Sequence, residues 1–486
     1  MNGKNELQKR YGLPTAICMV VGIVIGSGIF YKSQNVLQTT AGDALMGVLA
    51  WIIGGAVMAT LSVTFGVMAT KYEKCGGAVD YAEATCGGTF AYFIGWFMSM
   101  IYYPAMTSVL AWVSARYTLV AIRGNDSGIA SPECMVLAAF YLIAVYFINS
   151  LAPRLAGKFQ VSTTVAKLIP IFFIAIVGTV IGIASGNLSE SFGYVSEAEG
   201  QIYPGTDQAV GSGSLFTAIC CTVFAYEGWI IATAVNSEIK DSKKNLPIAL
   251  GIGAAVIAAA YILYYVGVLA LADMELLGEN GTSEAFKFFG PFVATVINVL
   301  VAVSCLGTLN GLMLGCTRGF YALSIRNEGF APDVMSEVDK KTNVPNNSSS
   351  VALMMCILWL VYFTGGQFFG WFGDYAFDSS ELPIVTMYPL YIPILIMFMI
   401  KEKDIHPVKR FVFPILSLVG VGVMVTASIV SHGISNLYYL IVFFAVMLVG
   451  LLFYRRGGIP VYALIINRIL GKKNDTDKKE VSVDNE

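Results

Sequence analysis

The chain has 486 residues, of which 56% are hydrophobic and 13% are charged, with a mean hydropathy of +0.69. A soluble domain carries about 25% charged residues, so the composition excludes one and predicts a polytopic membrane protein. The net charge of −2 gives no basic excess for binding nucleic acid. The two histidines, His406 and His432, and the nine unevenly spaced cysteines predict no metal site. We therefore expect no cofactor and no enzymatic activity.

Twelve apolar runs are long enough to cross a membrane as helices. They cover residues 13–37, 44–69, 90–121, 134–151, 160–185, 213–236, 247–271, 291–323, 351–369, 382–400, 411–431 and 436–454. The longest loops between them, 186–212 and 324–350, are too short for a further soluble domain. The sequence thus predicts an all-α integral membrane protein.

The distribution of basic residues orients these spans. With a cytoplasmic N-terminus, all but five of the 30 basic residues fall on the cytoplasmic side or in the tail. The exceptions are Lys32, Arg116, Arg123, Lys167 and Lys287. The positive-inside rule then predicts a multi-pass protein of the cytoplasmic membrane with both termini, 1–12 and 455–486, in the cytoplasm. We expect the source to be bacterial.

Two predicted spans contain breaks that a membrane helix does not need. The first is Gly26-Ser27-Gly28-Ile29-Phe30, and the second is Phe224-Ala225-Tyr226-Glu227-Gly228-Trp229. An α-helix rises about 1.5 Å per residue, which places both breaks at about the same depth in the membrane. The two segments cross the membrane in opposite directions. The segments are five spans apart, which predicts inverted five-helix repeats over 13–185 and 213–400, with 411–454 forming the last two helices.

The first break predicts a carboxylate site. It creates a half-helix N-terminus near Ile29, where the free N–H groups of residues 27–29 and the positive end of the helix dipole suit an anion. Carbonyl groups released by the breaks can accept hydrogen bonds from an ammonium group, so the two together suit an α-amino acid. We expect the substrate to contact Val24, Gly26, Ser27, Gly28, Ile29, Phe224, Ala225 and Glu227. Paired glycines also serve as a close-packing face, but packing does not explain Glu227.

Two ionisable side chains, Lys167 and Glu227, lie deep inside the predicted spans. A charge at that depth costs at least about 2.5–3.5 kcal/mol, which indicates a functional role. Lys167 can donate to carbonyl groups freed by the first break, or extend towards the cytoplasmic interface. Glu227 can face the substrate, line a solvated vestibule or carry a proton.

Five stretches of the chain are similar to one known family. The first, Val21–Phe30, resembles the helix 1 signature of the amino acid–polyamine–organocation (APC) superfamily. The others, Phe224–Trp229, Ser237–Pro247, Val165–Ile169 and Ser304–Gly311, resemble its motifs in helix 6, the following loop, helix 5 and helix 8. The similarity is greatest to the L-amino acid transporter family and its bacterial serine/threonine and alanine/serine/cysteine exchangers. The loop at residues 72–77 departs from the family pattern because it lacks a proline.

This resemblance implies a leucine-transporter-type fold that works by alternating access. It implies that Ser27, Gly28 and Ile29 bind the substrate carboxylate and that the carbonyls of Val24 and Phe224 bind its amino group. The Phe224 ring would close over the bound substrate from outside.

The resemblance also implies that Lys167 replaces a sodium ion. We therefore expect a sodium-independent exchanger of small or medium neutral L-amino acids. A proton-coupled symporter, a permease for cationic amino acids or polyamines with Glu227 as counter-charge, and a non-transporting sensor on the same fold remain alternatives. Cys134, in a predicted external loop, has the wrong spacing for the disulfide that joins animal members to a heavy chain, so we expect no such subunit.

Overall fold

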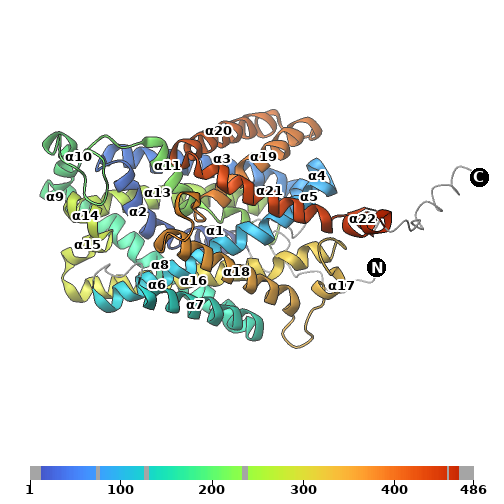
Figure 1. The fold of residues 1–486 in the computed structure, drawn as a ribbon. Helices are drawn as coiled ribbons and strands as arrows, with labels where there is room; N and C mark the ends of the chain where they lie inside the picture. Colours follow the sequence, from blue (N-terminus) through green and yellow to red (C-terminus); the bar gives the residue numbers. More distant parts are fainter. Residues whose placement is uncertain (1–11, 73–76, 125–130, 233–238, 457–458, 470–486) are drawn as a thin grey trace, which may run out of the picture.

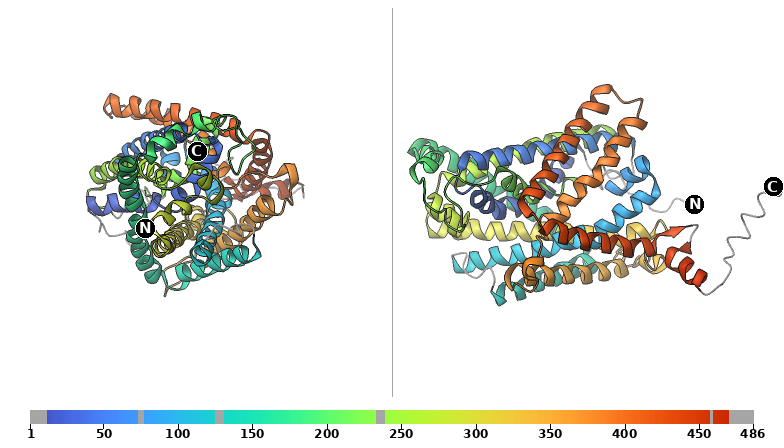
Figure 2. Two further views of the ribbon diagram at one scale, coloured as in Figure 1. Left: turned by 90° about the vertical axis from the view of Figure 1, so that its left-hand side faces the viewer. Right: turned by 45° about the horizontal axis from the view of Figure 1, so that its top comes forward.

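A computed structural model of the chain describes residues 12–72, 77–124, 131–232, 239–456 and 459–469. Within these residues, ten helices are long and apolar enough to cross a membrane. They run side by side in an elongated bundle (Figure 1), which Figure 2 also shows from one end. Parts of two sequence motifs, residues 73–76 and 237–238, lie outside the described residues, as do both chain ends, 1–11 and 470–486.

The long spans are single helices or helices joined through a π-helical turn (η1, η2 and η6). They are α3 (Ala44–Lys71), α5–η1–α6 (Gly88–Phe97, Met98–Tyr102, Tyr103–Arg123), α7 (Pro132–Leu151), α8–η2–α9 (Pro153–Phe173, Ile174–Gly178, Thr179–Ser185), α13 (Ser242–Leu269), α16 (Pro291–Ser324), α18 (Asn346–Phe368), α19 (Leu382–Lys401), η6–α20 (Val408–Val412, Phe413–His432) and α21 (Ser435–Phe453). Each coincides with one of the predicted spans.

The two remaining predicted spans are the ones predicted to be broken. The first consists of α1 (Leu13–Val24) and α2 (Gly28–Thr39), and the second of α11 (Leu215–Tyr226) and α12 (Trp229–Ala232). Helices α1 and α11 are shorter than a full span because each ends near the middle of its apolar run.

Short elements connect the spans, and the sequence analysis did not predict them. They are α4 (Ala78–Cys86), α10 (Asn187–Glu197), α14 (Met274–Asn280), α15 (Ser283–Phe286), the 3₁₀ turns η4 (Lys287–Phe289) and η5 (Gly373–Tyr375), α17 (Pro332–Met335), α22 (Val461–Ile469), and the antiparallel strands β1 (Arg455–Arg456) and β2 (Ile459–Pro460). Elements α10 and α14 lie at one end of the bundle, on the left in Figure 1, and α17 and α22 lie at the other.

Large apolar side chains cover the outer surface of the bundle. Examples on five helices are Phe140, Val180, Leu358, Val419 and Phe444, each more than half exposed. A soluble protein rarely exposes so much apolar surface, whereas lipid chains cover it without cost. The exposed belt therefore agrees with a membrane protein.

Cys134 corrects one expectation. It lies in the first turn of α7 rather than in a loop, and it is fully buried. The Ser131 side chain accepts a hydrogen bond from its backbone N–H and caps the helix there, a preference of serine that starts the helix earlier than hydropathy alone indicates. The thiol is therefore not exposed for an intermolecular disulfide.

The backbones of α13 and the π-helical turn η2 touch. A methyl group on Gly267 would collide with the carbonyl oxygen of Ile174, and one on Gly178 would lie 2.7 Å from the carbonyl oxygen of Gly267. Small residues at such crossings let helix backbones approach and gain dispersion contacts in lipid. Gly251, on the same helix, has only Val63 nearby, at 3.7 Å.

We expect Gly267→Ala to destabilise the protein by about 1–3 kcal/mol, because the methyl group overpacks this crossing. Gly251→Ala is the control, since it adds the same methyl group to the same helix where there is space. Thermal unfolding of the purified variants in detergent measures the difference. Equal midpoints for Gly267→Ala and the wild type would contradict the close crossing.

Candidate functional site

The first break separates α1 from α2. Helix α1 ends at Val24, Ile25 adopts an extended conformation (φ −64°, ψ 109°), and α2 begins at Gly28. The first intrahelical hydrogen bond of α2 runs from the Tyr31 N–H to the Ser27 carbonyl. The N–H groups of the preceding residues therefore have no acceptor within the helix and remain available to a ligand.

The second break separates α11 from α12. Helix α11 ends at Tyr226, Glu227 is extended (φ −75°, ψ 161°), and Gly228 has a φ of +104°. Only glycine adopts that φ without strain, which explains why the chain turns here before α12 begins at Trp229. Both breaks predicted from the sequence are therefore present.

The two breaks meet each other. A Cβ atom added to Gly28 would collide with the backbone of Ala225 and lie 2.9 Å from its side chain. A Cβ on Gly26 would lie 3.0 Å from Cγ2 of Thr308 on α16. Glycine at position 28 thus lets the start of α2 pack directly against the end of α11, and glycine at position 26 lets the first break lie close to α16.

Ser27 lies in this contact with its hydroxyl group unused. The residue is fully buried, and its Oγ has no hydrogen-bond partner among the described residues. A buried polar group without a partner costs about 1–3 kcal/mol. Its position next to the free N–H groups of α2 makes it a candidate ligand-binding group.

Tyr261 on α13 joins the two breaks, and the sequence analysis did not identify it. Its hydroxyl oxygen lies 3.1 Å from the carbonyl oxygens of both Val24 and Ala225. A tyrosine O–H carries one proton and satisfies one carbonyl at a time. The other carbonyl remains available for an ammonium group. Tyr261 follows three alanines in an apolar run, and no motif distinguished it from a packing residue.

Lys167 on α8 is fully buried, and its Nζ donates to the carbonyl of Gly22. In a continuous helix, that carbonyl would accept from the N–H of residue 26, which lies beyond the break. The contact with a carbonyl freed by the break is therefore the one predicted, and Lys167 does not extend to the interface.

Glu227 accepts a hydrogen bond from the Tyr102 hydroxyl at 2.5 Å. Tyr102 ends the π-helical turn η1, a kind of irregularity that is frequent at functional sites. Glu227 is partly exposed, whereas its neighbours Tyr226 and Trp229 are buried. None of the ion pairs found among the described residues involves its carboxylate.

The structure adds buried charges that the sequence analysis missed. Lys32 on α2 pairs with Glu381, which precedes α19, at 2.6 Å, and the two side chains are 1% and 3% exposed. The other carboxylate oxygen of Glu381 lies 3.1 Å from Nε2 of His432. We call these three residues the Lys32 cluster. Lys167 and Glu227 are therefore not the only ionisable groups inside the bundle. Lys32 was one of the five exceptions to the charge rule, which was the available signal.

Aromatic rings lie between the breaks and the end that carries α10 and α14. The Phe224 and Tyr31 rings are in edge contact, with centroids 6.1 Å apart, and Tyr31 also contacts Trp112. Nζ of Lys32 lies 5.4 Å from the Phe224 ring centroid. Together with the Lys32 cluster, these rings connect α2, α6 and α11 on that side of the breaks.

At the other end of the bundle, ion pairs join segments that are distant in the sequence. Arg326, after α16, pairs with Asp80 on α4, and Lys71 contacts Glu402 and Asp404 at 2.5 Å each. Both ends are thus held by contacts between segments distant in the sequence.

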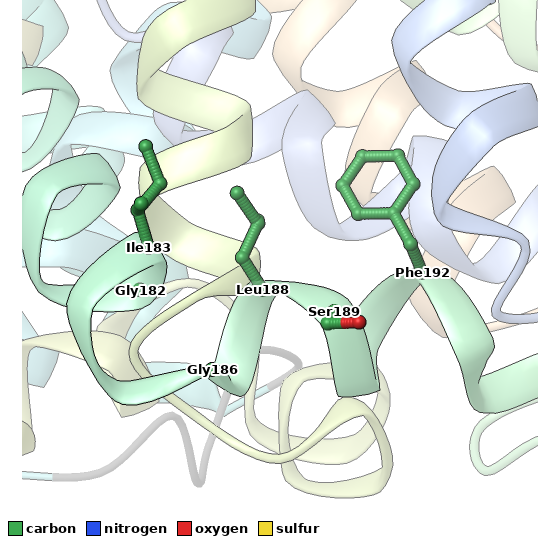
Figure 3. A pocket seen from close by; sticks show the side chains of 6 residues that line it. All are labelled: Gly182, Ile183, Gly186, Leu188, Ser189 and Phe192. Atoms are coloured by element: carbon green, nitrogen blue, oxygen red, sulfur yellow. The ribbon is translucent and has the colours of Figure 1, made fainter.

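A depression of about 340 Å³ lies elsewhere, at the junction of α9 and α10 (Figure 3). Its lining is Gly182, Ile183, Gly186, Leu188, Ser189 and Phe192. These groups are almost all apolar and contact neither break, so this depression is not the site described above.

These features define a multi-pass membrane protein with two interrupted helices that meet inside the bundle. The chain belongs to the amino acid permease family, whose family model matches residues 11–456. The family consists of transporters and not of enzymes.

Individual relatives cover most of the chain. The serine/threonine exchanger SteT of Bacillus subtilis is 27% identical over 94% of this chain and 97% of its own length. The b(0,+)-type amino acid transporter 1 of Mus musculus is 27% identical over 92% of this chain and 88% of its own length. The human cystine/glutamate transporter is 26% identical over 70% of this chain and 66% of its own.

We expect Tyr261→Phe to destabilise the protein by about 1–3 kcal/mol, because it leaves a buried carbonyl at the breaks without a donor. Tyr265→Phe is a matched control. It lies one turn further along α13, is equally buried and also packs against Trp51, but its hydroxyl has no hydrogen-bond partner among the residues described. Thermal unfolding compares the two variants. A larger loss for Tyr265→Phe would contradict the bridging role.

Proposed function

We propose that this protein is a sodium-independent secondary transporter that exchanges small or medium neutral L-amino acids by alternating access. The observation that carries the proposal is the contact between the two breaks. On one side are the N–H groups at the start of α2 and the Ser27 hydroxyl, none of which has a hydrogen-bond partner within the described part of the chain. On the other are the carbonyls of Val24 and Ala225, which share a single donor.

This arrangement suits both charged ends of an α-amino acid. The carboxylate would bind the N–H groups of Gly28 and Ile29 and the Ser27 hydroxyl at the positive end of the α2 dipole. The ammonium group would donate to the Val24, Phe224 and Ala225 carbonyls. In transporters, half-helix ends at mid-membrane bind substrate in this way.

The wider architecture belongs to the same proposal. We propose twelve spans with two inverted five-helix repeats, both termini in the cytoplasm, and the end with α10 and α14 outside. The amino acid exchanger and transporter functions in the relatives' names support transport and exchange. The buried Cys134 supports a transporter that works without a heavy-chain subunit.

Lys167 supports sodium independence. Its ammonium group already contacts a carbonyl freed at the first break. Unwound backbone carbonyls are where sodium-coupled transporters bind their ion. A fixed cation at this position would fill that role and leave no need for sodium.

Glu227 favours a second candidate, the transport of cationic amino acids. Its carboxylate has a tyrosine hydroxyl as its partner and no ion-pair partner among the described residues. A carboxylate in that position can pair with a basic substrate side chain or carry a proton. Under this candidate, Glu227→Gln would abolish uptake of lysine and arginine and spare neutral substrates.

The proposal predicts counterflow in proteoliposomes. Vesicles loaded with one unlabelled neutral amino acid should take up the same labelled amino acid faster than empty vesicles, and equally fast in sodium and in potassium. Testing all twenty amino acids as internal substrates identifies the substrate class. Stimulation by no amino acid would contradict the function, and activity in sodium alone would contradict the role of Lys167.

Lys167→Ala tests the role of the lysine directly. We expect it to lose exchange, because the freed carbonyl loses its cation while the fold keeps its other contacts. Lys158→Ala is the control, since it removes an exposed lysine from the same helix. Wild-type uptake that rises with an imposed proton gradient, and no longer does so in Lys167→Ala, would instead make Lys167 a proton carrier.

A further inference from the structure

We propose that Cys220, Glu381 and His432 form a site for a divalent transition metal of the zinc class, and that metal bound there inhibits transport. The three ligand atoms all lie within 4.8 Å of one another. They come from three segments: α11, the residue before α19, and the end of α20. The site replaces the sequence-based expectation that neither histidine takes part in metal binding.

The distances between the ligand atoms fit a tetrahedral metal. Sγ of Cys220 lies 3.7 Å from Nε2 of His432, and that nitrogen lies 3.1 Å from Oε2 of Glu381. Zinc binds sulfur at about 2.3 Å and nitrogen or oxygen at about 2.0–2.2 Å. Those bond lengths place tetrahedral ligands roughly 3.3–3.6 Å apart, so these two pairs need only small side-chain shifts, and all three atoms lie within 4.8 Å of one another. Three protein ligands leave a fourth position open to water.

The ligands are held in place by their surroundings. Lys32 donates to Oε1 of Glu381 at 2.6 Å, and to the Ser380 hydroxyl at 3.2 Å. These bonds fix the carboxylate so that Oε2 faces His432. Partners that orient a ligand in this way raise the metal affinity of many sites. The carboxylate also lies between the ammonium group and the metal position, which lowers their repulsion.

The site has an entry path. Cys220 and Glu381 are buried, but the His432 side chain is 12% exposed, and the next residue, Gly433, is exposed at the end of α20. A metal ion can reach His432 first and then the thiol, which releases its proton on binding. The thiolate and the carboxylate then offset the charge of the metal.

Bound metal would hold three segments together. Cys220 lies one helical turn before Phe224 on α11, the helix whose end meets α2. Opening this side of the bundle requires α11 to separate from α19 and α20. A metal that bridges them would keep this end closed and slow exchange. This regulation rests on the proposed transport function, whereas the metal site itself does not.

Binding is tested first, on the full-length protein in detergent after removal of any polyhistidine tag. We expect one Zn²⁺ per chain, and Co²⁺ in its place should give a thiolate-to-cobalt charge-transfer absorption band. Cys220→Ser and His432→Gln should each weaken zinc binding at least about tenfold, since the loss of even an orienting partner costs about 10–100-fold. The controls Cys356→Ser and His406→Gln should bind as the wild type does. They remove a buried cysteine on α18 and the other, exposed histidine.

Transport is tested second. Zinc should slow wild-type exchange in proteoliposomes and leave Cys220→Ser unaffected relative to its own zinc-free rate. No stoichiometric zinc, or equal binding by wild type and both cluster variants, would overturn the site. Zinc bound at the cluster with unchanged exchange would overturn the inhibition. Protein that binds zinc at the cluster but exchanges no amino acid would overturn the transport proposal and the inhibition, and leave the metal site standing.

Discussion

Backbone groups that lose their helical partners inside a membrane must find others, and this constraint determines the centre of the protein. Two helices break in the middle of the bundle, and the released groups are paired in specific ways. Lys167 donates a hydrogen bond to the Gly22 carbonyl, and the Tyr261 hydroxyl lies within hydrogen-bond distance of the carbonyls of Val24 and Ala225. Among the residues that the structure describes, the N–H groups at the start of α2 and the Ser27 hydroxyl have no such partner. A zwitterionic ligand can supply hydrogen-bond partners for these groups.

The ion pairs at the two ends of the bundle differ in how deeply they are buried. At the end with α10 and α14, Lys32 and Glu381 are both buried, and separating them without water would cost about 3–5 kcal/mol. At the other end, Lys71 and its partners are partly exposed, and such pairs contribute at most about 1 kcal/mol each. We therefore expect the end with α10 and α14 to open only when water enters and solvates Lys32 and Glu381 as they separate.

Much of the fold could be predicted from the sequence because lipid makes hydropathy a strong signal. The apolar runs predicted the spans, and glycines in the middle of two of these runs predicted the breaks. The position of Lys167 deep inside a span predicted its contact with a carbonyl at the first break. Tyr261 could not be predicted, since a tyrosine in an apolar helix resembles a packing residue until its hydroxyl is placed. Glu381 and His432 lie 51 residues apart, at the ends of two spans, where charge is common, and only the folded chain brings them to Lys32. The short connecting helices have too few residues for a periodic pattern.

The most direct test of this account is an experimental structure with a transported amino acid bound. The account predicts that its carboxylate lies within hydrogen-bond distance of the Gly28 and Ile29 N–H groups, with the Ser27 hydroxyl turned towards it. Its ammonium group would face the Val24 and Ala225 carbonyls. A substrate bound away from both breaks, or one whose carboxylate does not contact the start of α2, would contradict it.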